Sequence, residues 1–149
     1  MGCDIHMILQ AKGPHDKMWS TYILPDKYVG RDYSFFGILA GVRSIEYEPV
    51  SGPKGLPDDL TIPLQDRLEA LLIETHLDPD NPEYHSQTYL SMTEIDEYLE
   101  EKLEDMTYFK EGSDYDPVPE MKKLRELHDF MKHFKVRGGE VRLVMGFDN

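Results

Sequence analysis

The sequence contains little that could hold the chain together covalently or anchor it in a membrane. It has one cysteine and one tryptophan among 149 residues. A single cysteine cannot build an internal disulfide framework, which is typical of proteins kept in a reducing cytoplasm. No apolar run approaches the roughly 18 residues that a membrane-spanning helix needs, and the first residues carry neither a basic segment nor a long apolar one. We therefore expect a cytoplasmic protein with no secretory signal and no membrane contact.

Positive charge is also scarce. The chain has 16 basic and 29 acidic residues, which gives a formal charge of −13. Such a surface repels a phosphate backbone, whose neutralisation drives nucleic-acid binding, so we expect no direct nucleic-acid binding. Acidic residues crowd residues 94–116, which leaves an acidic interaction protein or nucleic-acid mimic open as an alternative. A solvated helix face explains the same run without any partner.

The length and the hydrophobic content of 40% suit one globular domain over residues 1–149. Alternating apolar residues predict strands, and helical spacing predicts helices. The strands are expected at residues 3–12, 19–24 and 141–148, with an extended segment at 85–90, and the helices at residues 34–42 and 64–76 and in segments beginning near 93 and 118. This order is typical of an α+β fold, a small sheet with paired N- and C-terminal strands packed with about four helices.

Two of the expected helices have recognisable first residues. Ser34 is an expected N-cap for the helix at residues 34–42, and Thr93 with Asp96 resembles the start of the third helix. The helix at residues 34–42 is apolar on most sides. We therefore expect it to be the central buried helix.

Polar residues interrupt both terminal strands on one face. Asp4 and His6 share a face of the first strand, and Gly146 and Asp148 share a face of the last. If the two strands pair antiparallel, these residues lie side by side. An imidazole and two carboxylates at one strand end suit a divalent metal. The alternative is that these polar groups are only solvated.

Several segments of the chain are familiar in combination. They are residues 1–6 (MGCDIH), Trp19, residues 31–43, 55–58, 85–86 before 89–90, and 141–149. Together they resemble a group of small phage and prophage proteins of unknown function. The resemblance covers both ends and the middle of the chain but not the acidic residues 94–111. It implies the cytoplasm of a host cell if the chain is phage-encoded, and it implies no activity.

Asp4 and His6 form an Asp-x-His pair on the first strand. Metallophosphoesterases open with the same pair, which holds a metal that activates water. Their further motifs, Gly-Asp-x-x-Asp and Gly-Asn-His, do not occur in this sequence. The pair therefore indicates an independent metal site and not membership in that superfamily.

Further side chains could complete such a site. His85 could be a third ligand or a general base, although it also fits an ordinary surface histidine. Arg31, Arg43 and Arg142 offer planar guanidinium groups that fit phosphate, unless each pairs with one of the many carboxylates. Trp19 could stack on a nucleotide base, unless it belongs to the core.

These features predict metal-assisted hydrolysis of a phosphoester in a phosphorylated small molecule or nucleotide. Asp4, His6 and Asp148 are the expected ligands of a divalent metal, His6 and His85 the expected catalytic groups, and the three arginines and the tryptophan the expected ligand contacts. The main alternative is a non-catalytic homo-oligomer that counters host defence by sequestering a nucleotide signal. The sequence leaves open whether the chain is an enzyme.

Overall fold

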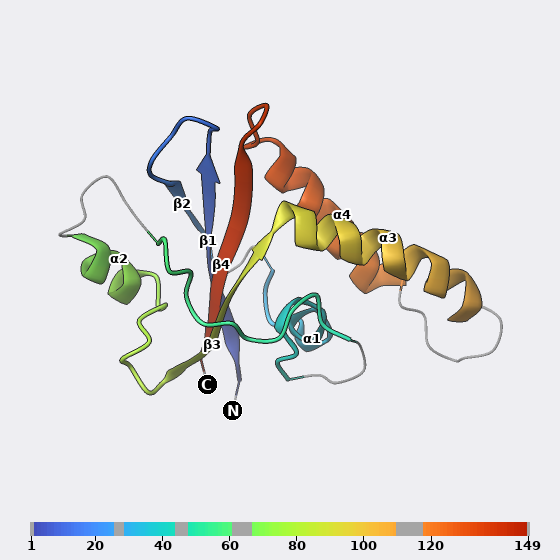
Figure 1. Ribbon diagram of the computed structural model, residues 1–149. Coiled ribbons are helices and arrows are strands. Elements are labelled where there is room, and N and C mark those ends of the chain that lie inside the picture. The colour runs from blue at the N-terminus through green and yellow to red at the C-terminus, as the bar shows by residue number, and fades with distance from the viewer. Residues whose placement is uncertain (1, 26–28, 44–47, 61–66, 110–117, 149) are drawn as a thin grey trace.

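A four-stranded antiparallel sheet with helices on both faces forms the protein (Figure 1). The computed structural model describes residues 2–25, 29–43, 48–60, 67–109 and 118–148. The strands are β1 (Asp4–Lys12), β2 (Ser20–Leu24), β3 (Tyr84–Ser91) and β4 (Glu140–Asp148), in the order β2-β1-β4-β3. The helices are α1 (Tyr33–Ala40), α2 (Leu68–Glu74), α3 (Met92–Phe109) and α4 (Val118–Lys132). The predicted α+β fold is confirmed.

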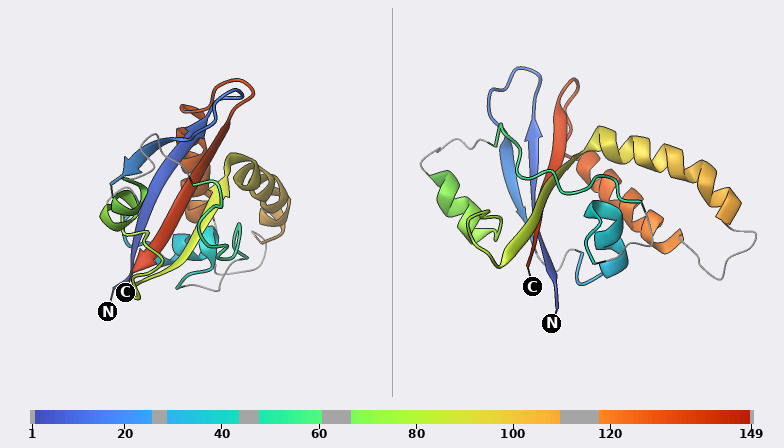
Figure 2. Two further views of the ribbon diagram at one scale, coloured as in Figure 1. Left: turned by 60° about the vertical axis from the view of Figure 1, so that its left-hand side comes forward. Right: turned by 60° about the horizontal axis from the view of Figure 1, so that its bottom comes forward.

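The helices divide unequally between the two faces of the sheet. Helices α1, α3 and α4 lie on one face, and α2 lies alone on the other (Figures 1 and 2). The two chain ends lie close together at one end of the sheet in all views. No helix within the described ranges is long and apolar enough to cross a membrane.

The terminal strands pair as their alternation predicts. In the β1–β4 register Asp4 lies opposite Asp148, and His6 lies opposite Gly146. Because side chains alternate between the faces of a sheet, these residues share the α2 face, while the odd-numbered residues of both strands point to α1, α3 and α4. The register therefore places the polar ends of both strands together on the less covered face.

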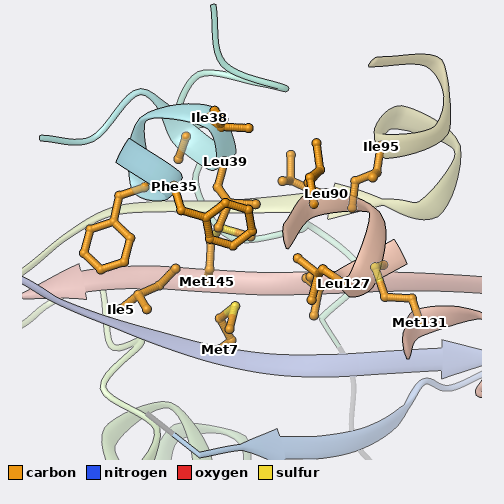
Figure 3. Packing of buried hydrophobic residues seen from close by; sticks show 14 of the residues in the cluster. Ile5, Met7, Phe35, Ile38, Leu39, Leu90, Ile95, Leu127, Met131 and Met145 are labelled. Atoms are coloured by element: carbon orange, nitrogen blue, oxygen red, sulfur yellow. The ribbon is translucent and has the colours of Figure 1, made fainter. Parts of the chain in front are cut away.

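The main core fills the space between the sheet and the three helices (Figure 3). Helix α1 lies at its centre, because every residue from Phe35 to Ala40 is buried. Figure 3 shows Leu39 pointing toward the sheet, on the side where Ile5 and Met145 lie. The predicted central buried helix is confirmed. A smaller cluster on the α2 face consists of Ile8, Leu60, Leu77 and Val144.

The predicted first residues of two helices are wrong by two positions. Asp32 caps α1 by accepting a hydrogen bond from the Phe35 amide, so Ser34 lies inside the helix. Ser91 caps α3, because its hydroxyl accepts from the Glu94 amide at 3.1 Å while the Glu94 carboxylate accepts from the Ser91 amide at 3.2 Å. This reciprocal pair is a capping box. Both corrections shift the helix start toward the N-terminus.

The remaining boundaries differ little from expectation. Helix α4 begins at Val118, and the extended segment near residues 85–90 is the strand β3. Helix α2 is described from Leu68 to Glu74, whereas the expected helix covered residues 64–76. Its predicted first residues belong to 61–66 and lie outside the described residues, as does the part of the acidic run at 110–117.

Candidate metal centre

Three potential metal ligands converge on the α2 face, at the end of the sheet where the chain begins and ends. His6 comes from β1, Asp148 from the end of β4, and His76 from the turn after α2. One donor atom from each lies within 4.8 Å of the other two, and within the described ranges this is the one such set. The Nε2 atom of His6 is 2.6 Å from Oδ2 of Asp148. The group could hold a metal ion.

A tight turn brings His76 to the sheet. Helix α2 ends with a hydrogen bond from the Leu77 amide to the Leu72 carbonyl at 2.8 Å, and His76 has a φ of 58°. Glycine most often occupies this left-handed position after a helix. The sheet makes room for the turn at Gly146, where an added Cβ would lie 3.0 Å from Leu77 Cδ2. Glycine opposite His6 therefore lets the histidine-bearing turn approach.

The imidazole of His76 is held between two aromatic rings. Its centroid lies 4.5 Å from that of His6, edge to face, and 5.1 Å from that of Tyr84, nearly parallel at 9°. Its Nδ1 atom is buried and has no hydrogen-bond partner among the described residues. Buried polar atoms are nearly always satisfied. The ring of His76 therefore has a buried nitrogen that is available to a ligand outside the protein.

The donor set fits a divalent transition metal. Two imidazoles and one carboxylate occur in catalytic zinc sites and in non-haem iron sites, where the remaining coordination positions take water or substrate. Ligand atoms around a tetrahedral zinc lie about 3.3 Å apart. The contact of 2.6 Å between His6 and Asp148 would open by a fraction of an ångström on binding. The other donor atoms of the group, which lie within 4.8 Å of one another, would have to move closer together.

A hollow of about 400 Å³ adjoins the group. His76 and Asp148 form part of its wall, and Tyr84, Glu83 and Arg31 also line it. A volume of this size accommodates a small molecule. Two of the three candidate metal ligands, His76 and Asp148, are therefore accessible from a surface hollow that contains a guanidinium group.

Asp4 lines the same hollow, but its carboxylate is not a member of the metal-ligand group. Both of its oxygens bind Arg31, with Oδ1 2.6 Å from Nε and Oδ2 3.1 Å from Nη2. This hydrogen bond holds the pKa of the Asp4 carboxyl below its ordinary value. The Asp4 amide donates to Oδ1 of Asp148 at 3.2 Å. The expected ligand Asp4 is thus replaced by His76, and Asp4 supports Asp148 and Arg31 instead.

His85 lies on the other face of the sheet. It pairs with Phe147 in the β3–β4 register, and the two rings are 6.3 Å apart in a stacked arrangement. Its Nδ1 lies 2.9 Å from the Ser86 hydroxyl. Because Asp148 and Phe147 are successive strand residues, they point to opposite faces. The expected role of His85 as ligand or general base at the metal group is therefore not supported by its position.

Arg142 and Trp19 belong to a structural network at the far end of the sheet. The guanidinium lies 3.9 Å from the centre of the Trp19 ring and donates to Gln10 Oε1 at 2.8 Å and to Asp59 Oδ1 at 2.6 Å. Both Arg142 and Trp19 are about 95% buried. The network connects the segment with Asp59 to the sheet, so the structure places these two expected ligand contacts away from the candidate metal ligands.

The carboxylate of Asp59 contributes to this network in a pH-dependent way. Burial would raise the pKa of Asp59, but hydrogen bonds from Arg142 and Trp19 outweigh it and leave the pKa below its ordinary value. A lowered pKa means that the unfolded chain binds the proton more tightly. The contribution to stability is therefore present above about pH 4 and is lost as the pH falls below that value.

We expect Asp59→Asn to destabilise the protein by about 1–3 kcal/mol at pH 7. Removing one partner of a buried pair costs about 3–5 kcal/mol, but the Asp59 side chain is 57% exposed and water screens the interaction. Urea denaturation at pH 7 and pH 3 measures the difference, which should shrink at pH 3. The exposed neighbour provides the control, because Asp58→Asn should change the stability by less than about 0.5 kcal/mol. An equal loss at both pH values would contradict the assignment.

Arg43 follows α1 at an exposed position with a φ of 64°. Its guanidinium lies 5.8 Å from the ring centre of Tyr33, at the N-terminal end of the same helix. It does not line the hollow beside the candidate metal ligands. Of the three arginines expected to bind a ligand, the structure therefore places Arg31 alone at this hollow.

Comparison of the chain with protein-family models, with curated proteins and with solved structures found no match. The function is therefore inferred from the geometry of the site. The alternation of the terminal strands predicted two of its three candidate ligands, His6 and Asp148, and did not indicate His76. The available signal was a histidine at the expected end of a helix, and nothing in the local pattern indicated that the turn would reach the first strand.

Proposed function

We propose that this protein is a metal-dependent hydrolase that cleaves a phosphoester in a small molecule. The observation that carries the proposal is the convergence of His6, His76 and Asp148 beside a hollow containing Arg31. Three protein ligands are enough to hold a divalent metal and leave a position for water. A guanidinium within the same hollow supplies a group that recognises phosphate.

The chemistry follows from this arrangement. A divalent metal would lower the pKa of a bound water to about 7, which would make hydroxide available near neutral pH. In the proposed hydrolysis, an oxygen from water would bond to phosphorus while the ester bond from phosphorus to the alcohol oxygen breaks. The proton released from water ends on the alcohol, so the products are an alcohol and a phosphate. Asp148 and the two histidines would hold the metal, and Arg31 would neutralise phosphate oxygens.

The hydrolase proposal is tested with a panel of phosphoesters. Metal-stripped protein is incubated with p-nitrophenyl phosphate and with mono-, di- and cyclic nucleotides, with and without Mn²⁺. We expect product only when the metal is present. Asp148→Asn should abolish turnover while preserving the fold, because the amide keeps the side-chain shape but is a poor metal ligand.

The control variant is His85→Ala, which removes a histidine from the opposite face and should leave turnover within about two-fold of wild type. Heating the incubated protein then releases anything bound. Recovery of intact nucleotide without any product would contradict hydrolysis and favour sequestration. Neither binding nor product across the panel would favour an interaction protein.

A further inference from the structure

The hollow beside the candidate metal ligands carries more negative than positive charge. Its charged walls are the carboxylates of Asp4, Glu83 and Asp148 and the single guanidinium of Arg31. Like charges that line one hollow repel one another and repel an incoming anion. In the absence of a cation, the hollow therefore disfavours the phosphate group that the proposed function requires.

Arg31 is positioned to bind an incoming anion. Asp4 occupies its Nε and one terminal nitrogen, at 2.6 and 3.1 Å. The two side chains are 59% and 39% exposed, and ion pairs this exposed contribute little to stability. Exchanging the carboxylate for a phosphate oxygen therefore costs little. The guanidinium also has further donors that Asp4 does not use.

Asp4 connects this guanidinium to the metal-ligand group. Its side chain binds Arg31, and its amide donates to Oδ1 of Asp148 at 3.2 Å. The other oxygen of Asp148, Oδ2, faces His6 at 2.6 Å. Asp4 would consequently contact both the residue that binds the cation, Asp148, and the residue that binds the anion, Arg31. Their electrostatic attraction would act across the same hollow.

We infer that binding is ordered, in that a divalent cation at His6, His76 and Asp148 creates the phosphate site, which Arg31 then completes. This inference rests on the proposed function. The cation brings two positive charges to a hollow with three carboxylates and one guanidinium, so phosphate is accepted only after the cation binds. By thermodynamic reciprocity, phosphate must then tighten the binding of the cation.

Mn²⁺ affinity with and without inorganic phosphate tests the inference. Free Mn²⁺ is counted by electron paramagnetic resonance during titration of the metal-stripped protein. We expect saturating phosphate to lower the Mn²⁺ dissociation constant by at least about five-fold, the low end of ordinary coupling between sites. Phosphate alone, measured by calorimetry on metal-free protein, should show no binding.

Two arginine variants distinguish phosphate binding by Arg31 from a general effect of positive charge on the protein. Arg31→Gln should retain the Mn²⁺ affinity measured without phosphate to within about three-fold and should lose the coupling. Arg43→Gln removes the same charge from outside the hollow and should keep the coupling intact. Glu83→Gln removes a repelling carboxylate, so phosphate should bind the Mn²⁺-loaded variant more tightly than it binds the wild type.

The outcomes distinguish this inference from the function on which it rests. Mn²⁺ binding that phosphate does not change, or phosphate binding that needs no cation, would overturn the ordered mechanism and leave the metal centre in place. Coupling that survives in Arg31→Gln would overturn the role of Arg31. Absence of any Mn²⁺ binding would overturn the proposed function together with the inference.

Discussion

Replacing His76 by glycine is expected to weaken metal binding more than about 100-fold while leaving the protein folded. Loss of a group that only supports a ligand already costs about 10–100-fold in metal affinity, so loss of a ligand should cost more. Glycine suits the backbone at this position, because the φ of 58° is one that side-chain-bearing residues adopt at a cost. The variant therefore removes the imidazole without forcing the turn after α2 to rearrange.

Isothermal calorimetry with Zn²⁺ measures the effect, and circular dichroism checks the fold. His85→Ala is the matched control, because it deletes an imidazole that stacks on Phe147 on the opposite face. The control should bind Zn²⁺ as the wild type does. Wild-type affinity in His76→Gly would show that the imidazole is not a ligand, and the proposed site would then lose its third member.

Leu39→Ala should cost about 2–5 kcal/mol of unfolding free energy. Leu39 is fully buried in α1, between the sheet and the other helices of the main core. Truncation removes apolar contact and leaves a cavity that the surrounding β-sheet cannot close, because the strands are fixed by their hydrogen bonds. The loss should therefore lie well above that of an ordinary surface substitution.

Urea denaturation followed by far-ultraviolet circular dichroism gives the value. Ile73→Ala, on the exposed side of α2, is the control and should cost less than about 0.5 kcal/mol, since Ile73 is 53% exposed. A loss below about 1 kcal/mol for Leu39→Ala would mean that α1 does not occupy the core.

Alternation of apolar residues predicted which side chains of the two terminal strands share a face. Burying one apolar face of each strand determines which residues share a face, and the observed register, with Asp4 opposite Asp148, satisfies this requirement. Helix starts were less predictable, because capping residues compete. Asp32 lies two positions before Ser34, and Ser91 two positions before Thr93. Which residue caps depends on where the preceding chain enters, which local sequence does not determine.

The site itself was only partly predictable, because sequence periodicity gives the face of a sheet but not the position along it. Arg142 shares the face of Asp148, yet it lies six residues away on β4, or about 20 Å at the rise of a strand. His76 reaches His6 through a turn whose approach depends on the missing side chain of Gly146. Contacts of this kind come from tertiary packing between segments distant in sequence.

The nuclear magnetic resonance spectrum of the histidine rings during a Zn²⁺ titration tests the central claim most directly. The chain has six histidines, and the ring nitrogen of a histidine shifts when it coordinates a metal. We predict that the resonances of His6 and His76 shift together and saturate at one Zn²⁺ per chain, while those of His85 and His128 stay in place. Shifts spread over all the histidines, or none at His6 and His76, would contradict a metal centre at the paired ends of the terminal strands.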